Sequence, residues 1–134
     1  KINFIAITGG DKKLYERIKK DFRCNHFLAV NWTDVMDEYM KMSDFVIGKP
    51  GGLISSECMS IKRLLVVVGL IPGVEYYNAR YMEKNMFGVD ATNKRVRKEI
   101  IEKTIFSKNF RLHENPTYKE NPAKNIVNAI LQPK

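Results

Sequence analysis

The chain has 134 residues, of which 44% are hydrophobic, and it carries a formal net charge of +8. This length and composition suffice for one domain with a hydrophobic core over residues 1–134, and they exclude a disordered or low-complexity protein. Cys24 and Cys58 give neither a disulfide framework nor a zinc site, so a reducing cytosolic compartment fits best. The longest apolar run, residues 64–68, is far shorter than the roughly 20 residues of a membrane-spanning helix, and the first residues show no signal-peptide layout.

The basic excess is concentrated toward the C-terminus. Residues 94–134 carry ten basic and four acidic side chains, against 13 and 11 in residues 1–93. A solvated basic face is the commoner explanation of such a bias, and peripheral contact with an anionic membrane surface is the alternative. Nucleic acid is not an expected partner, because the exposed aromatic residues that typically interleave such a surface are not evident. We therefore predict a cytoplasmic protein with at most peripheral membrane contact.

Short apolar runs alternate with amphipathic segments along the chain, a pattern that predicts strands alternating with helices. The predicted strands span, in chain order, residues 2–8, 26–30, 44–48, 64–68 and 87–90. The predicted helices span about residues 11–22, 34–42 (with Thr33 as N-cap), 53–61, 75–85, a mainly helical stretch after Asn93, and 122–131. Run 64–68 is apolar throughout, as in a strand covered on both faces, so we expect it to be central.

The two C-terminal helices are each predicted to bury one apolar stripe. The first stripe consists of Val96, Ile100, Ile101 and Ile105, and the second of Ile126, Val127, Ile130 and Leu131.

Strands and helices joined by short connections imply parallel, right-handed βαβ units. In an open parallel sheet, ligands bind beyond the carboxyl ends of the strands. Turns that are rich in glycine or polar residues follow four of the strands, at Gly9-Gly10, 31–33, 48–52 and 70–73. We expect these turns to line one edge of the sheet and to form the ligand site.

The turn Lys49-Pro50-Gly51-Gly52 directly precedes a predicted helix, whose N-terminus offers unpaired N–H groups and the positive end of a dipole. The two glycines would let a diphosphate approach the backbone closely, and Ser55 and Ser56 offer hydroxyls in the first helical turn. Each such contact contributes only about 0.3–1 kcal/mol, so several must converge. An isolated Pro-Gly-Gly would be better explained as a plain tight turn.

Further polar candidates lie on the same predicted edge. Glu57 could accept both ribose hydroxyls of a nucleotide, although alone it would be a solvated helix residue. Glu75 and Asn78 could bind the hydroxyls of a sugar, although Glu75 could equally be a favourable charge in a first helical turn. Trp32 follows a strand end where a uracil ring could dock, yet packing is the commoner role for such a residue.

Other classes of site are not supported by the sequence. The dinucleotide pattern GxGxxG and the phosphate loop GxxxxGK[ST] are both absent, which argues against a nicotinamide enzyme and against an ATPase or GTPase. His26 and His113 have no nearby nucleophile or metal-binding neighbour in the sequence. We therefore assign no catalytic residue and no metal ligand.

Four ordered blocks carry a family resemblance: VNWTDVMDEYM (30–40), SDFVIGKPGGL (43–53), Glu57 and IPGVEYYNA (71–79). Together they resemble the C-terminal domain of family 28 glycosyltransferases, and are most similar to monogalactosyldiacylglycerol synthases and processive diacylglycerol glucosyltransferases. The segments ITGGDKKLYE (7–16) and NPAKNIV (121–127) resemble the first strand and the terminal helix of that domain, so the likeness covers nearly the whole chain.

The resemblance implies an α/β fold: a Rossmann-like three-layer domain with a parallel sheet, the C-terminal half of a glycosyltransferase-B fold. It further implies an inverting transfer of a hexose from a uridine-diphosphate (UDP) sugar to a lipid acceptor such as diacylglycerol, with no cofactor and no obligatory metal. The family places the acceptor site and the catalytic base in an N-terminal domain that this sequence lacks. The chain is then a donor-binding half, excised or part of a split enzyme, and inactive until joined to that domain.

Matched position by position, the resemblance places Gly51 and Gly52 at the phosphates and Glu57 at the ribose. Trp32 and Thr33 would lie beside the base, and Glu75 and Asn78 near the donor sugar, while the family lysine is Lys49, whose role stays open. The full predicted substrate-binding set is Gly9, Gly10, Trp32, Thr33, Lys49, Pro50, Gly51, Gly52, Leu53, Ser56, Glu57, Glu75 and Asn78.

Two positions depart from the family pattern. Ile54 replaces a hydroxyl residue, and Val74 replaces the glutamine before Glu75. These losses leave open a non-catalytic nucleotide-sugar-binding or regulatory module. A lipid II synthase-like N-acetylglucosamine transferase and a nucleotide-sugar epimerase, which share this type of half-domain, are further alternatives.

Overall fold

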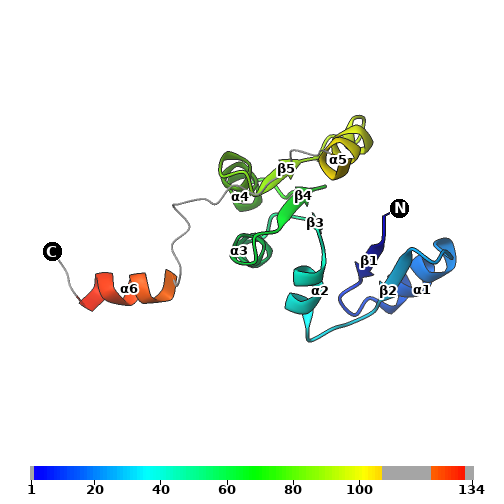
Figure 1. The fold of residues 1–134 in the computed structure, drawn as a ribbon, viewed down its shortest axis with the longest axis horizontal. Helices are drawn as coiled ribbons and strands as arrows, with labels where there is room; N and C mark the ends of the chain where they lie inside the picture. Colours follow the sequence, from blue (N-terminus) through cyan, green and yellow to red (C-terminus); the bar gives the residue numbers. More distant parts are fainter. Residues whose placement is uncertain (1, 107–121, 132–134) are drawn as a thin grey trace. The chain divides into compact units, whose positions relative to one another are not determined.

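The structure is a computed structural model that describes residues 2–106 and 122–131 (Figure 1). Its strands and helices confirm the predicted alternation. In chain order they are β1 (Phe4–Ile7), α1 (Lys12–Asp21), β2 (Phe27–Val30), α2 (Met36–Met42), β3 (Phe45–Gly48), α3 (Gly52–Ser60), β4 (Leu64–Val67), α4 (Val74–Lys84), β5 (Gly88–Asp90), α5 (Arg97–Phe106) and α6 (Pro122–Leu131).

The chain divides into two compact units, Lys1–Tyr39 and Met40–Lys134, and each is described by itself. The single domain over residues 1–134 stays a prediction.

In the first unit, β1 and β2 form a parallel pair in which Phe4 lies opposite Phe27. Asp11 caps α1, because its carboxylate accepts a hydrogen bond from the backbone N–H of Leu14 at 2.9 Å. The predicted N-cap role of Thr33 is wrong, because α2 begins only at Met36. The hydroxyl of Thr33 instead accepts from the N–H of Val35 at 3.1 Å, in the turn before the helix.

In the second unit, β3, β4 and β5 form a parallel sheet with β4 at its centre. All four residues of β4 are buried, which confirms the prediction for this apolar run. Alternate β4 residues belong to different apolar clusters, as the two-residue period of a strand requires. In Figure 1, α3 and α4 lie on one side of this sheet and α5 on the other, so the unit has three layers.

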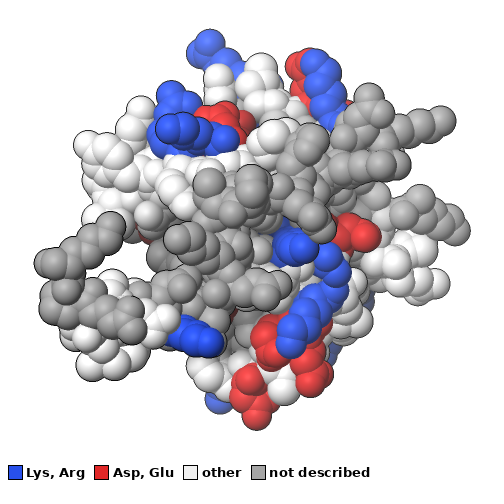
Figure 2. All heavy atoms as spheres, turned by 60° about the vertical axis from the view of Figure 1, so that its left-hand side comes forward, with Lys and Arg blue, Asp and Glu red and all other residues white. Residues whose placement is uncertain are grey.

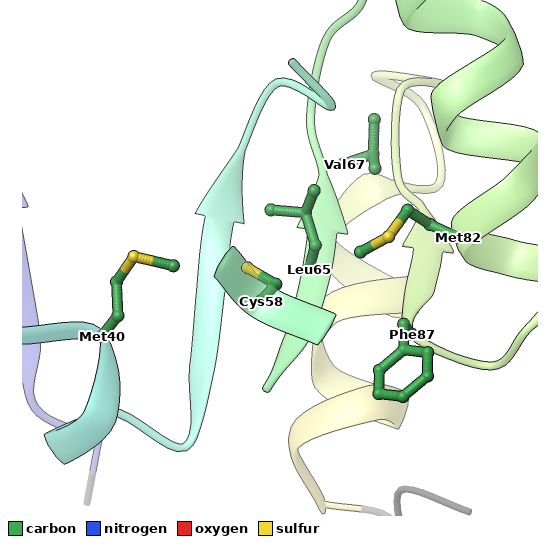
Figure 3. Packing of buried hydrophobic residues seen from close by; sticks show 6 residues of the cluster. All are labelled: Met40, Cys58, Leu65, Val67, Met82 and Phe87. Carbon is green, nitrogen blue, oxygen red and sulfur yellow. The ribbon is translucent and has the colours of Figure 1, made fainter. Parts of the chain in front are cut away.

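The cluster on the α3 and α4 side is built largely from flexible or small apolar side chains. This main apolar cluster contains Met40, Cys58, Leu65, Val67, Met82 and Phe87 (Figure 3). Burial, with a smaller contribution from the charge of Glu57, raises the pKa of the Cys58 thiol to about 12. The thiol therefore stays protonated and packs as a small apolar group.

The C-terminal helices depart from their predicted burial. Ile100 and Ile101 do pack against the cluster formed by Leu64, Val66 and Ala91, but Val96 is 40% exposed and precedes the first residue of α5. The four predicted core residues of α6, namely Ile126, Val127, Ile130 and Leu131, are exposed. A helical pattern identifies an apolar face, but it does not specify the surface that covers the face. Within the described residues, no helix combines the length and the apolarity that crossing a membrane requires.

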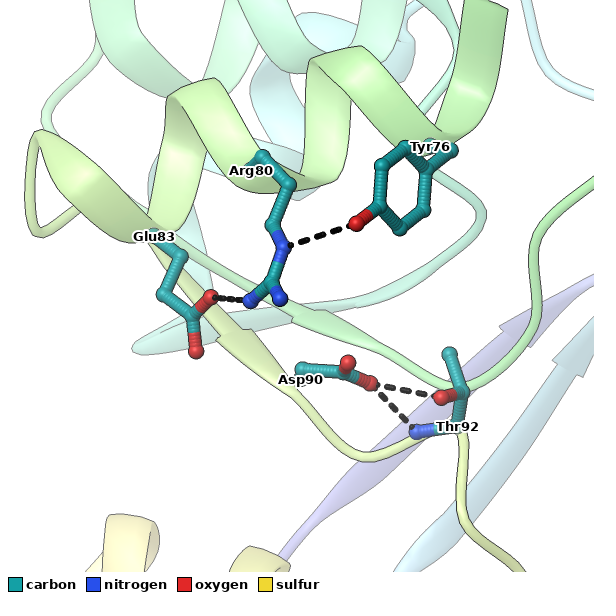
Figure 4. Close-up of polar contacts among 5 residues, drawn as sticks. All are labelled: Tyr76, Arg80, Glu83, Asp90 and Thr92. Atoms are coloured by element: carbon teal, nitrogen blue, oxygen red, sulfur yellow. Dashed lines mark hydrogen bonds and ion pairs between the residues drawn. The ribbon is translucent and has the colours of Figure 1, made fainter. Parts of the chain in front are cut away.

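An arginine that the sequence analysis passed over ties together the carboxyl ends of β4 and β5. The guanidinium of Arg97 donates to the carbonyls of Val68 at 2.7 Å, Ala91 at 2.8 Å and Thr92 at 3.0 Å. In the same turn, the carboxylate of Asp90 accepts from the N–H and the hydroxyl of Thr92 (Figure 4). These charge-assisted bonds fix the sheet edge from which the β4–α4 loop departs.

The close packing of α4 on β5 is possible because Gly88 has no side chain. A Cβ atom built on this residue would lie 2.7 Å from the Cβ of Met82 and 3.3 Å from its carbonyl carbon. We predict that Gly88→Ala lowers the free energy of unfolding by about 1–3 kcal/mol, because α4 must shift to relieve the overlap. Urea unfolding followed by circular dichroism measures the change.

Gly69→Ala is the matched control, because a Cβ atom there would meet nothing within 4 Å. Equal stability of the two variants would contradict the packing described for α4 and β5.

Candidate functional site

The central turn of the candidate site connects β3 to α3. Gly48 ends β3, and its carbonyl accepts from the N–H of Val68 at 3.2 Å, which holds the turn against the end of β4. The Pro50 side chain that follows is fully buried. Gly51 is the N-cap of α3 in an extended conformation, and no side chain caps this helix. The N-terminus of α3 therefore offers backbone N–H groups and a positive dipole end, a combination that suits an anion.

A second loop, between β4 and α4, lies against this turn. Gly73 has φ 105° and ψ −123°, a conformation that favours glycine, and α4 begins directly after it. The carboxylate of Glu75 accepts from the N–H of Ile71 at 2.5 Å and so folds the loop back on its helix. Asn78 reaches further, because its side-chain amide donates to the carbonyl of Pro50 at 2.9 Å. The structure thus brings the turn at 49–52 and the start of α4 together, as predicted.

Three residues in the first half of α3 differ in how they face solvent. Ile54 packs against the main apolar cluster, and its side chain lies 3.4 Å from where a Cβ of Gly48 would be. Ser55 is also buried, and its hydroxyl makes no hydrogen bond among the described residues. Ser56 is exposed, and its hydroxyl donates to the carbonyl of Gly52 at 2.8 Å. Of the two serines considered as ligands, only Ser56 lies at the surface.

Exposed charged and apolar side chains surround the turn. Lys49 and Glu57 are both exposed, and the carboxylate of Glu57 makes no hydrogen bond or ion pair within the described residues. Leu53 is 81% exposed in the first turn of α3, and Val74 is 76% exposed at the first position of α4. The edge thus presents one cation, one unengaged carboxylate and two apolar side chains near an uncapped helix.

The remaining predicted site residues lie in the first unit. Gly9 and Gly10 have φ angles of 63° and 90°, and the N–H of Gly10 donates to the carbonyl of Asn31 at 2.8 Å. A Cβ atom on Gly10 would lie 3.8 Å from the indole ring of Trp32, which is 70% exposed. The turns after β1 and β2 therefore meet, with Thr33 next in the chain. That these turns share one edge with residues 49–57 stays a prediction.

The histidines were considered in the sequence as possible metal ligands or catalytic groups. His26 is exposed, and its Nδ1 lies 3.0 Å from the side-chain oxygen of Asn3, while His113 lies outside the described residues. Over residues 2–106 and 122–131, no group of three or more His, Cys, Asp and Glu side chains is placed to hold a metal ion.

Part of the basic excess is neutralised locally. In α5, Lys103 pairs with Glu99 at 2.7 Å and Lys98 lies 3.8 Å from Glu102. The hydrogen bond from Lys103, together with its charge, lowers the pKa of Glu99. Figure 2 shows basic and acidic side chains interspersed on the face that it draws. On α4, Arg80 pairs with Glu83 at 2.8 Å and lies over the ring of Tyr76 (Figure 4).

A parallel α/β sheet with a glycine turn before an uncapped helix, at the carboxyl ends of its strands, is typical of domains that bind nucleotide phosphates. The family described as "Glycosyltransferase family 28 C-terminal domain" matches residues 1–131. The chain belongs to this family.

Several curated relatives have the same printed name, processive diacylglycerol beta-glucosyltransferase. The chain is 34% identical to the protein of Staphylococcus epidermidis and 32% identical to those of Staphylococcus saprophyticus and Staphylococcus aureus, each over 85 residues. Those residues make up 63% of this chain and 22% of each relative, so the chain matches only about a fifth of their length. No solved structure matches the chain significantly.

The buried hydroxyl of Ser55 gives a test of the α3 packing. A buried hydroxyl without a partner costs about 1–3 kcal/mol, so we predict that Ser55→Ala leaves the free energy of unfolding unchanged or raises it. Thr104→Ala is the matched control, because the buried hydroxyl of Thr104 donates to the carbonyl of Ile100 at 2.7 Å. That control should lose about 1 kcal/mol in urea unfolding. A larger loss for Ser55→Ala than for Thr104→Ala would contradict the position of the Ser55 side chain.

Proposed function

We propose that this chain is the donor-binding half of an inverting glycosyltransferase, which transfers a hexose from a UDP-sugar to a lipid acceptor such as diacylglycerol. Membership of the family and the shared name of the relatives support the class of reaction. The observation that carries the assignment of the donor site is the uncapped N-terminus of α3, which has Gly51 as its N-cap and Gly52 as its first residue and is held against α4.

The diphosphate is proposed to bind at this helix end. The N–H of Gly51 already donates to the carbonyl of Lys49 at 2.9 Å, so the donors left for a phosphate begin with Gly52. Gly51 and Gly52 carry no side chain that would keep a phosphate oxygen from the backbone. The exposed ammonium group of Lys49 adds a positive charge beside the turn, and the hydroxyl of Ser56 could donate to a phosphate oxygen in place of its bond to the carbonyl of Gly52.

The ribose is assigned to Glu57. Its carboxylate is exposed and makes no hydrogen bond or ion pair within the described residues, so it can accept from both ribose hydroxyls without breaking an existing contact. The uracil base is assigned to Trp32 and Thr33, with Gly9 and Gly10 in the neighbouring turn. The donor sugar is assigned to the start of α4, which carries Glu75 and Asn78.

The acceptor and the catalytic base are assigned to a partner domain rather than to this chain. The chain matches 22% of the length of its relatives, so most of each relative has no counterpart in these residues. We propose that transfer requires an acceptor-binding N-terminal domain, and that the assembled enzyme works on the membrane surface, where its lipid acceptor resides. No cofactor and no metal ion is part of the proposed mechanism.

One observation favours a second function, that of a nucleotide-sugar-binding module without catalysis. Val74 presents a 76% exposed apolar side chain where the resemblance leads us to expect a glutamine. This position follows Gly73 at the proposed sugar end of the site. A hydrocarbon side chain there cannot form hydrogen bonds with the sugar, so other residues of the site must hold the UDP-sugar. The site would then discriminate less well between sugars.

Calorimetric titration with UDP, UDP-glucose and UDP-galactose tests the donor site. We expect the chain to bind UDP, with and without a metal chelator, and Glu57→Ala to weaken binding by about ten- to a hundredfold, as the loss of hydrogen bonds to a charged group implies. Glu102→Ala is the control, because Glu102 is an exposed residue of α5 with only a long ion pair to Lys98.

The pattern of binding decides between the two functions. A clear preference for one sugar over UDP alone supports a transferase donor site. Equal affinity for UDP and both sugars supports the non-catalytic module. Binding that Glu57→Ala leaves intact would refute the position of the nucleotide.

A further inference from the structure

We propose, on the basis of the donor site above, that Asn78 is a positioning residue for the diphosphate turn. Its side-chain amide holds the carbonyl of Pro50, and through that peptide unit it orients the backbone that presents N–H groups to the phosphates. This action on the diphosphate passes through Pro50 and is separate from the contact with the donor sugar that is proposed above for Asn78.

The peptide unit between Pro50 and Gly51 connects Asn78 to the turn. A trans peptide is planar, so its carbonyl and its N–H point in opposite directions and are fixed together. The carbonyl accepts from Asn78 at 2.9 Å, and the N–H donates to the carbonyl of Lys49 at 2.9 Å. Both polar groups of this peptide unit are therefore held, one from α4 and one from within the turn.

The next peptide unit is oriented by α3. The carbonyl of Gly51 accepts from the N–H of Ser55 at 3.0 Å, which is a bond of the first helical turn. The N–H of Gly52 points away from that carbonyl, in the direction from which a ligand approaches an uncapped helix. The direction of this donor thus depends on α3 and also, through the backbone of Gly51, on the preceding peptide unit that Asn78 holds.

Two successive glycines make such a tether necessary. A Cβ atom on Gly52 would meet nothing within 4 Å, so no neighbouring side chain restricts this residue by packing. Glycine also loses more conformational freedom on ordering than any other residue. A turn that samples several conformations must be ordered when the ligand binds, and that ordering lowers the affinity.

Helix α4 is suited to act as the rigid element. Its residues Ala79 and Met82 are buried, and Met82 belongs to the main apolar cluster. The same helix also fixes its own loop, because Glu75 accepts from the N–H of Ile71. One helix therefore sets the conformation of both loops at the proposed donor site.

The binding test compares Asn78→Ala with Asn85→Ala. The amide of Asn85 donates to the carbonyl of Tyr81 at 2.7 Å, a bond of the same kind at the far end of the same helix. We expect Asn78→Ala to weaken the binding of UDP by about three- to tenfold and the binding of UDP-glucose at least as much, and Asn85→Ala to weaken neither. If only the binding of UDP-glucose is weakened, Asn78 acts on the sugar alone and the inference is wrong.

A measurement without ligand separates this inference from the proposed function. Amide hydrogen exchange at Gly51 and Ser55 should be faster in Asn78→Ala than in Asn85→Ala, while exchange in β4 stays the same in both. If the unmodified chain binds no nucleotide, the proposed function fails and the exchange data still decide the role of Asn78. Asn78→Asp provides a second variant, because it keeps the size of the side chain and removes the donor. Unchanged exchange at the turn in both Asn78 variants would overturn the inference.

Discussion

Strand β4 is buried on both faces, and the arrangement of the second unit follows from that constraint. Leu65 and Val67 need apolar partners on one side and Leu64 and Val66 on the other, so helices must cover both faces of the sheet. Parallel strands then place all their carboxyl ends at one edge, where the connections to α3 and α4 begin. The glycine turn lies at this edge because β3 runs parallel to β4 and ends there.

Polar side chains then fix the loops that the sheet has brought together. Arg97 binds three carbonyls at the ends of β4 and β5, Glu75 closes its own loop, and Asn78 joins that loop to Pro50. None of these groups adds much apolar burial. They restrict backbone that is exposed and rich in glycine, and such backbone must be ordered before it can present donors to an anion.

Much of the fold could be predicted from the sequence, because local periodicity is strong where elements are amphipathic or wholly apolar. The alternation of strands and helices and the central position of β4 follow from such local patterns. The predicted N-cap role of Thr33 was wrong because the first residue of a helix depends on the backbone conformation of the preceding turn, which the hydrophobic pattern does not specify. The predicted burial of α6 was wrong because a pattern does not specify what covers an apolar face.

In the candidate site, too, local features could be predicted from the sequence and contacts between distant residues could not. The order of motifs and the turn at 49–52 were recognisable from glycines, a proline and a family resemblance. The bonds from Asn78 to Pro50 and from Arg97 to Val68 were not, because they join residues 28 and 29 positions apart in the sequence. Ile54 was treated as a lost ligand, whereas in the structure it packs on the apolar cluster below the turn. A basic or amide side chain in the first half of a helix that follows a strand is a signal that could have pointed to such bonds.

The central claim is that the diphosphate of a UDP-sugar binds at the N-terminus of α3. Titration of the isotope-labelled chain with UDP, followed by amide chemical shifts, tests it most directly. The account predicts that the largest shifts occur at Gly52, Leu53 and Ile54, the first N–H groups of that helix. Binding that shifts amides elsewhere and leaves these three unchanged would contradict it.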